Sequence, residues 1–239
     1  MTGALVQCGA IGTFMVLGAL YARRPSQGFV TRDTLINLAN GALLFAFRAG
    51  VIAGAVGWLE IGVFDASAIS SPAAQVAVAF IMLDFSRYWL HRAHHRVEWL
   101  WMFHRVHHMS ERLDSTSGLR MHVVDFVQLA VLPVLLFGAL LNTSQWAPWT
   151  IVAALCVGGV FDAFQHANLR WNADSRFGRL WGIAFNNPHF HAWHHTRDGA
   201  DCDGNYGNTL VIWDRMFGSD VTKAHLPEAF GLEPDQAIE

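Results

Sequence analysis

The chain has 239 residues, of which 53% are hydrophobic and only 15% charged, a composition that predicts membrane-spanning helices. The net charge at pH 7 is −3, and the sequence has neither a basic tract nor a phosphate-cradling glycine loop, which excludes nucleic acid as an expected partner. Cys8, Cys156 and Cys202 form no motif, so no disulfide framework is expected.

Five apolar stretches each approach the roughly 20 residues that a helix needs to cross the hydrocarbon core. In chain order they are 4–22, 35–58, 72–90, 123–141 and 147–165. The arginines of the first stretch follow its apolar run, so we expect a retained anchor rather than a cleaved signal. The second stretch contains a cation, Arg48, and the last two form a tight hairpin that could dip without crossing. We therefore predict four to five membrane helices.

The lysines and arginines are distributed unevenly between the predicted loops. They gather after the first stretch, between the third and fourth, and after the fifth, whereas 59–71 and 142–146 contain none. Cytoplasmic loops collect Lys and Arg, so this bias places the N-terminus outside and the tail inside. We expect an all-α, multi-pass integral membrane protein in which residues from about 166 onward form a cytoplasmic, histidine-lined helical cap. Residues 1–239 are treated as one domain because the cap shares a site with the earlier histidines.

Three similar histidine clusters fall on the predicted cytoplasmic side. They are His91-Arg-Ala-His-His95, His104-Arg-Val-His107-His108 and His191-Ala-Trp-His194-His195. Residues three and four apart share one face of a helix, so each cluster aims its imidazoles in one direction. Neutral imidazole is the commonest side-chain metal ligand, and eight or more exceed the four of one zinc site. The pattern predicts a two-metal site built almost wholly from nitrogen.

Other histidines are judged by their positions. His166 closes the fifth stretch at the level of the clusters, which favours a ligand role. His122, which heads the fourth stretch, is evenly balanced between ligand and structural residue. His94 shares the face of His91 but is the doubtful member of its cluster, and His189 is secondary because two residues from His191 it would point elsewhere on a helix; whether either binds metal is left open. His225 is expected on the surface.

Two further side chains are candidates for a role near the site. Asp84 lies two helical turns before His91, so it is expected either to support an imidazole or to pair with Arg87. Cys202 lies between two aspartates and is expected to be inert rather than a spare ligand.

The choice of metal is not set by the ligands alone. A structural zinc site would be closed and would usually contain thiolates. An all-nitrogen pair of sites beside a bilayer suits iron that activates dioxygen, but zinc or manganese hydrolysis would use similar ligands. A histidine-rich surface patch is a further alternative. Against it, Trp, Phe and Arg recur among the histidines at fixed offsets, whereas opportunistic tracts are low-complexity runs.

These motifs resemble the three histidine boxes of the fatty acid hydroxylase/sterol desaturase superfamily. The matching segments are Asp84-Phe-Ser-Arg-Tyr-Trp-Leu-His-Arg-Ala-His-His95, Trp101-Met-Phe-His-Arg-Val-His-His108 and Pro188-His-Phe-His-Ala-Trp-His-His195. Asn205-Tyr-Gly and Ile212-Trp-Asp-Arg-Met-Phe-Gly218 are similar to the segment after the third box. The resemblance runs from about 80 to 218. It departs at Arg120-Met-His122-Val-Val-Asp125, where many members have Pro after the histidine and Glu at the last position.

The resemblance implies a membrane-bound, non-haem di-iron enzyme that uses dioxygen to hydroxylate or desaturate a lipid such as a fatty acyl chain, sterol or alkyl or acyl glycerolipid. The metal ligands that it implies are His91, His95, His104, His107, His108, His166, His191, His194 and His195. The same residues without His166 form the expected catalytic set. The sequence contains no fused haem domain or Rossmann fingerprint, so an external electron-transfer protein or small reductant is expected.

Two rival functions come from other classes. A metal carrier or transporter would need histidines spread across the depth of the membrane, whereas these lie at one level. A non-catalytic lipid-binding homologue would have no need of so many metal ligands. The lipid, the oxidised position, the choice between hydroxylation and desaturation and the electron donor are not set by these patterns.

Overall fold

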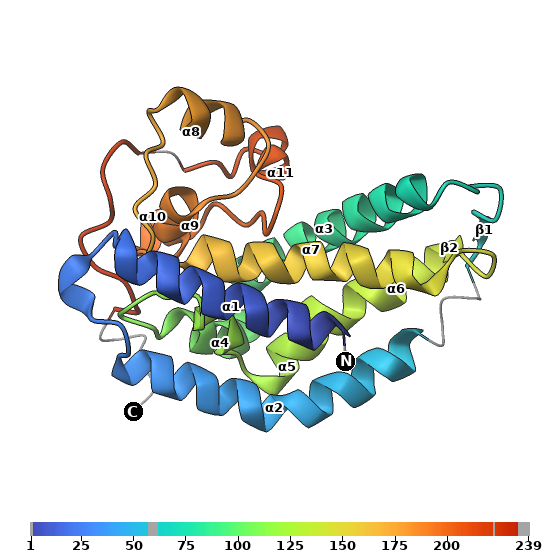
Figure 1. The fold of residues 1–239 in the computed structure, drawn as a ribbon, viewed down its shortest axis with the longest axis horizontal. Helices are drawn as coiled ribbons and strands as arrows, with labels where there is room; N and C mark the ends of the chain where they lie inside the picture. The colour runs from blue at the N-terminus through green and yellow to red at the C-terminus, as the bar shows by residue number, and fades with distance from the viewer. Residues whose placement is uncertain (1, 57–61, 222, 234–239) are drawn as a thin grey trace.

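Long helices fill one side of the molecule, and short helices gather at one of its ends (Figure 1). The computed structural model describes residues 2–56, 62–221 and 223–233. The described helices are α1 (Thr2–Leu20), η1 (Pro25–Gln27), α2 (Arg32–Val56), α3 (Pro72–Arg96), α4 (Glu98–His108), η2 (Ser117–Leu119), α5 (Val123–Phe126), η3 (Val127–Val131), α6 (Leu132–Leu140), α7 (Pro148–His166), α8 (Arg176–Trp181), α9 (Pro188–His194), α10 (Gly199–Cys202) and α11 (Ile212–Met216). The described strands are β1 (Phe64–Asp65) and β2 (Leu141–Asn142).

Within the described residues, three helices are long and apolar enough to cross a membrane. They are α1, the run Val123–Leu140 formed by α5, η3 and α6, and α7. Helix α1 packs beside α7 (Figure 1), yet Gly18 is its one buried residue and the others are exposed or half-exposed. Such a large uncovered apolar surface is favourable when lipid covers it. The structure is therefore that expected of a helical membrane protein, and the first, fourth and fifth stretches are confirmed as helices long and apolar enough to span.

The other two expected stretches form helices α2 and α3, but their role as membrane spans stays a prediction. Residues 57–61 and the side chain of Arg48 lie outside the described part of the second stretch. Helix α3 carries Asp84 and Arg87 within its expected span, which lowers its apolar character.

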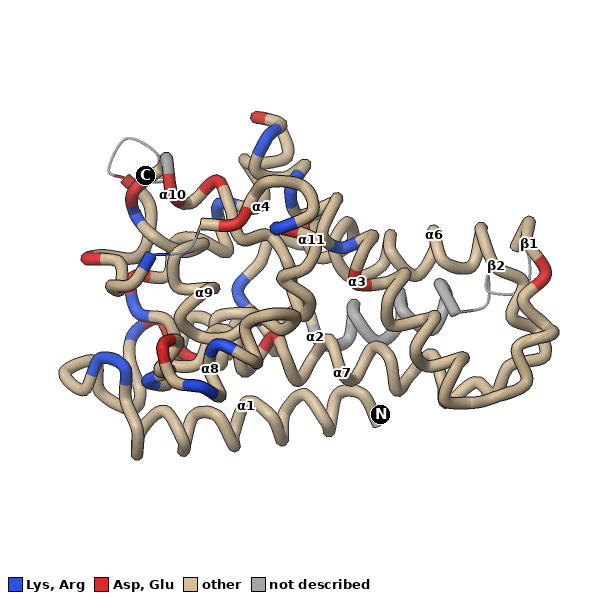
Figure 2. Tube along the Cα trace, turned by 90° about the horizontal axis from the view of Figure 1, so that it is seen from above, with Lys and Arg blue, Asp and Glu red and all other residues tan. Residues whose placement is uncertain are grey.

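The two loops without Lys or Arg meet at one end of the bundle. Strand β1 follows α2, strand β2 follows α6, and they pair in parallel with Phe64 opposite Leu141 and Asp65 opposite Asn142. Figure 2 shows that Lys and Arg gather away from this end, around the short helices. The uneven charge distribution in the sequence thus corresponds to two ends of the folded molecule.

A proline shapes the helix from Val123 to Leu140. Pro133 has no N–H, so the carbonyl four residues earlier, that of Leu129, has no helical donor of the usual kind. Arg87 of α3 donates its Nε–H to this carbonyl at 3.2 Å. Immediately before the proline, Val127–Val131 forms a π-helical turn, as π-bulges often do beside such interruptions. The missing helical bond is replaced by a tie between two helices.

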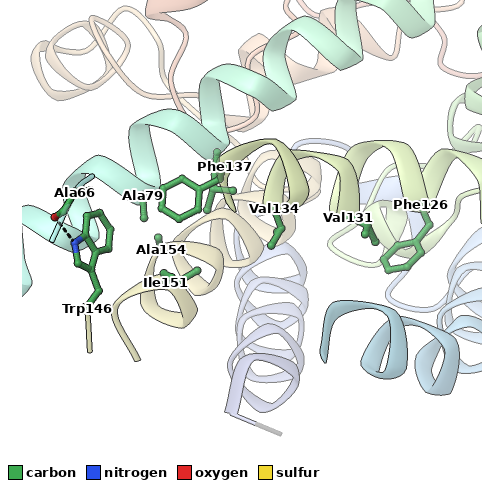
Figure 3. Packing of buried hydrophobic residues seen from close by; sticks show 10 residues of the cluster. Ala66, Ala79, Phe126, Val131, Val134, Phe137, Trp146, Ile151 and Ala154 are labelled. Carbon is green, nitrogen blue, oxygen red and sulfur yellow. Dashed lines mark hydrogen bonds between the residues drawn. The ribbon is translucent and has the colours of Figure 1, made fainter. Parts of the chain in front are cut away.

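The apolar core lies where α3, α6 and α7 converge (Figure 3). Its buried members are Ala66, Ala79, Leu83, Phe126, Val131, Val134, Phe137, Trp146, Ile151 and Ala154. The indole Nε1–H of Trp146 donates to the carbonyl of Ala66 at 2.9 Å (Figure 3). This bond joins the segment after β2 to the segment after β1 and so closes that end of the bundle.

The two tryptophans near the start of α7 offer a matched test. Trp146 is 5% exposed, whereas Trp149 is 57% exposed. We expect Trp146→Phe to lower the free energy of unfolding by about 0.5–1.5 kcal/mol, because it removes the buried indole hydrogen bond to the Ala66 carbonyl, which then keeps only the N–H of Ile69. Trp149→Phe should change it little. Thermal unfolding in neutral detergent measures both, and equal midpoints would contradict the assignment.

Candidate metal centre

A one-residue turn brings the first two histidine clusters face to face. Helix α3 ends at Arg96, and α4 begins at Glu98. Between them Val97 is extended (φ −115°, ψ 111°) and is both the C-cap residue of α3 and the N-cap residue of α4. Helix α4 therefore folds back beside the end of α3.

The third cluster lies on a short helix with a well-formed start. The side chain of Asn187 accepts hydrogen bonds from the backbone N–H groups of His189 and Phe190, and Pro188 occupies the first helical position. The Asn-Pro pair in the sequence is thus a helix start. Helix α9 carries His191 and His194 and packs against α7, which ends at His166.

Nine histidines converge in two neighbouring groups. The first group contains His91, His95, His104, His108 and His194. The second group contains His107, His166, His191 and His195. Within each group the candidate ligand atoms all lie within 4.8 Å of one another. These nine are the residues that the sequence predicts as ligands.

The spacing of the ring nitrogens matches the spacing of ligands around an ion. The Nε2 atoms of His91 and His104 are 3.0 Å apart in the first group. In the second group, His191 Nε2 lies 3.0 Å from His166 Nε2 and 3.1 Å from His195 Nε2. Two nitrogens that each lie about 2.0–2.1 Å from one ion are about 3.0–3.4 Å apart. Each group therefore fits a metal ion.

The outer nitrogen of several rings is fixed by a backbone carbonyl. Nδ1–H donates to Tyr206 O from His91 (2.8 Å), to Gly204 O from His194 (2.8 Å) and to Arg120 O from His107 (3.1 Å). These bonds place the proton on Nδ1, so the lone pair of Nε2 is directed into the group.

Two inner nitrogens have no hydrogen-bond partner. Within the described part of the chain, Nε2 of His95 and Nε2 of His194 are both buried and unpaired. Buried polar atoms are almost always satisfied, so each such exception calls for an explanation. A metal ion bound in the first group would supply the missing partner to both.

Burial keeps the imidazoles neutral. It lowers the pKa of His107 to about 4, and the neighbouring His166 adds to this effect. Burial also lowers the pKa values of His104, His108 and His195 well below the usual value. Metal ligation requires the deprotonated ring, so protons do not compete for these nitrogens at neutral pH.

A buried carboxylate supports the first group. Asp125 Oδ1 accepts from His104 Nδ1 at 3.0 Å and lies 3.6 Å from His94 Nε2. Its side chain is fully buried. The sequence singles out Asp125 only as a departure from the family pattern, because its 21-residue separation from His104 hides the contact.

The remaining candidate histidines lie outside both groups. His94 contacts the Leu90 carbonyl through Nδ1 at 2.6 Å and Gln128 Oε1 through Nε2 at 2.7 Å. His122 caps α5, since its Nδ1 accepts from Val124 N at 3.1 Å. His189 Nε2 lies 2.7 Å from the Lys223 carbonyl.

Asp84 has a role that neither sequence-based alternative anticipates. Its carboxylate accepts from the backbone N–H groups of Thr209 (3.1 Å) and Leu210 (3.2 Å) and from the indole of Trp213 (3.0 Å). It therefore anchors the segment after the third cluster to α3, a contact that links residues more than 120 positions apart.

Cys202 lies beside the first group. Its Sγ is 3.7 Å from His108 Nδ1, the nitrogen that faces away from the inner ring atoms. Burial raises the pKa of the thiol, with a further contribution from Asp203. A protonated thiol is a poor metal ligand, which agrees with the expectation that Cys202 is inert.

The segment after the third cluster is held in shape by Asp214, which sequence analysis did not assign. Its carboxylate accepts from the N–H groups of Tyr206 (2.7 Å) and Gly207 (2.8 Å) and from Ser219 Oγ (2.8 Å). Asn205, just before, has φ +58°, a left-handed conformation that asparagine tolerates. This loop presents the Tyr206 carbonyl to His91.

Several curated proteins are similar to this chain. An ornithine lipid hydroxylase of Rhizobium tropici is 33% identical over 150 residues, which are 62% of this chain and 42% of that protein. The alkylglycerol monooxygenase of Caenorhabditis elegans is 29% identical over 219 residues, 89% of this chain and 41% of that protein. The human alkylglycerol monooxygenase is 28% identical over 147 residues, 59% of this chain and 29% of that protein. No solved structure gives a significant match.

These similarities have a defined extent. The chain spans about two fifths of the length of the first two relatives. The fatty acid hydroxylase family model matches residues 76–219, a range that contains all three histidine clusters and more than half of the chain. The chain therefore belongs to the fatty acid hydroxylase family.

Proposed function

We propose that this protein is a membrane-bound oxidoreductase that hydroxylates or desaturates a lipid, using two iron ions, dioxygen and electrons from an external donor. The observation that carries the proposal is the packing of nine buried imidazoles into two adjacent groups with nitrogen separations of 3.0–3.3 Å. The names of the relatives, a lipid hydroxylase and alkylglycerol monooxygenases, support oxidation of a lipid.

In this proposal the first and second groups each hold one iron ion through the nine histidines. The catalytic set is the same without His166. Bound iron would supply the activation of dioxygen, which unreactive C–H bonds of a lipid chain require. In hydroxylation, one oxygen atom of dioxygen enters a C–H bond and the other leaves as water, with two electrons and two protons from the donor.

The protein's own contribution is to hold and shield the ligands. Backbone carbonyls and Asp125 keep the Nδ1 protons on the outer side of the rings. Burial excludes water from the groups and keeps the rings neutral. Positioned ligands cost little reorganisation when the metal binds.

The proposed setting is a multi-pass protein with four to five membrane helices and its site at the cytoplasmic face. Residues 1–239 act as one domain in this proposal. The lipid enters from the bilayer, and a separate electron-transfer protein or small reductant delivers the electrons. The charge distribution supports this orientation, because Lys and Arg gather at the end that carries the histidines (Figure 2).

A metal carrier is the second function to consider. A transit path needs ligands at successive depths, so that an ion can pass from one to the next. In this chain the nine histidines form two compact groups, and within each group the candidate ligand nitrogens all lie within 4.8 Å of one another. That compactness favours catalysis over transport.

Metal content tests the two groups separately. We expect about two irons per chain in the purified protein, and about one after His108→Ala or after His191→Ala, because each change removes a ligand from a different group. His225→Ala is the matched control, since this exposed residue lies outside both groups. Mass spectrometry of the metals measures the content. Two irons retained by both ligand variants would contradict the assignment.

Oxygen uptake tests the reaction. Membranes that contain the protein should consume dioxygen in step with lipid product when a lipid substrate and a reductant are supplied. His191→Ala should abolish this uptake, and His225→Ala should not. An oxygen electrode and lipid mass spectrometry would detect a gain of one oxygen atom or a loss of two hydrogen atoms. Absence of uptake with every lipid and a working reductant would reject the function.

Asp125 is expected to tune the first group. Asp125→Asn should weaken metal binding by about 10–100-fold, because the carboxylate orients His104 and increases the basicity of its ring. Asp125→Glu keeps the carboxylate and should restore most of the affinity. Competition with a chelator measures the affinity, and folding is checked by the unfolding midpoint. Equal affinities for the wild type and Asp125→Asn would exclude this role.

A further inference from the structure

A cavity with a cationic wall lies beside the metal centre, at the ends of two membrane-length helices. Its volume is about 330 Å³, within the range of small-molecule sites. Its walls include Arg23, Arg170, Trp171, Asn172 and His189. None of these residues belongs to the two histidine groups.

Arg23 is a buried cation with unused hydrogen-bond donors. Arg23 is 9% exposed, and its Nη1 donates to the Pro188 carbonyl at 2.7 Å. Its Nε and Nη2 are buried without an acceptor in the described part of the chain. The aromatic ring of Phe230 lies 5.2 Å from its Cζ.

The charge of Arg23 is also uncompensated. Among the described residues no carboxylate oxygen lies within 4.0 Å of its guanidinium. Its neighbour Arg24 is a second cation, and burial together with that charge lowers the pKa of Arg23 to about 9. Buried charges in proteins are normally paired, so this site lacks an anion.

The backbone holds two arginines at the same level. Ala22 and Leu169 form an antiparallel bridge, in which Arg23 N donates to Asn168 O at 2.9 Å and Arg170 N donates to Tyr21 O at 2.8 Å. Arg23 follows the end of α1 by three residues, and Arg170 follows the end of α7 by four. Residues just beyond a membrane helix lie at the depth of lipid headgroups.

We propose that this cavity binds the phosphate or carboxylate of a lipid headgroup, with Arg23 as the buried anchor and Arg170 at the exposed rim. A guanidinium matches both oxyanions through paired N–H donors. Asp174 also lines the cavity, but it is exposed, so the buried wall remains cationic. A bound headgroup would place an anion against this wall and neutralise the charge of Arg23.

The cavity adjoins the catalytic machinery through α9. Pro188, whose carbonyl accepts from Arg23, begins the helix that carries His191 and His194. A headgroup held at Arg23 would therefore lie beside the metal centre, and the substrate would be a lipid with an anionic headgroup. This identification of the substrate rests on the proposed lipid oxidation.

Binding without turnover tests the cavity independently of catalysis. The full chain in neutral detergent is titrated with dioleoylphosphatidic acid, with dioleoylglycerol, which lacks the phosphate, and with inorganic phosphate, and native mass spectrometry measures the bound fraction. We expect phosphatidic acid to bind at least tenfold more tightly than dioleoylglycerol. Arg23→Gln should remove this preference, whereas Arg23→Lys should retain part of it.

Two further variants keep the test decisive if Arg23→Gln folds poorly. Arg170→Gln changes an exposed residue of the cavity and should weaken phosphatidic acid binding severalfold. Arg176→Gln changes an exposed arginine outside the cavity and should have no effect. Equal binding of the two lipids, or an equal loss in Arg170→Gln and Arg176→Gln, would overturn the proposal. Displacement of phosphatidic acid by an equal concentration of inorganic phosphate would assign the site to a soluble anion and overturn the proposal that a lipid headgroup binds there.

Discussion

The structure depends on neutral imidazoles that face one another in a space closed to water. Ring nitrogens 3.0–3.3 Å apart direct their lone pairs at each other, an arrangement that is repulsive unless a cation or a proton lies between them. Burial disfavours the proton, because a charged ring loses its hydration. The arrangement therefore favours a metal ion, and much of the surrounding fold serves to hold these rings in place.

The scaffold achieves this with ordinary local devices. The extended Val97 reverses the chain between α3 and α4, and the Asn187 cap starts α9 where His191 and His194 can face α7. Carbonyls and Asp125 fix the tautomers of His91, His104, His107 and His194 from the outer side of these rings. Asp84 and Asp214 do not contact the imidazoles but hydrogen-bond to the segment that covers them. They fold residues 205–219 over the site, so that the Tyr206 carbonyl reaches His91.

The polar centre and the apolar helices meet at one end of the molecule. Helices α1 and α7 carry the apolar surface, and both end at the level of the site, where an antiparallel bridge joins the residues that follow them. The same bridge positions Arg23 and Arg170. A lipid that lies beside α1 and α7 would therefore have its headgroup at the arginines and its chain toward the apolar part of the bundle.

The sequence by itself predicted the nine histidines that converge, the helical class and three of the membrane-length helices. Local rules suffice for the clusters and the helices, because turn spacing places imidazoles on one face and about 20 apolar residues make a span, whereas the set of nine came from the resemblance to the family. It did not determine how the ligands are shared. The second and third clusters each contribute to both groups, whereas the first cluster contributes only to the first group. His107 separates from His104 and His108 because successive helical residues turn by about 100°. Asp84, Asp125 and Arg23 received their roles only from tertiary contacts, since their partners lie 21 to 165 residues away in the chain.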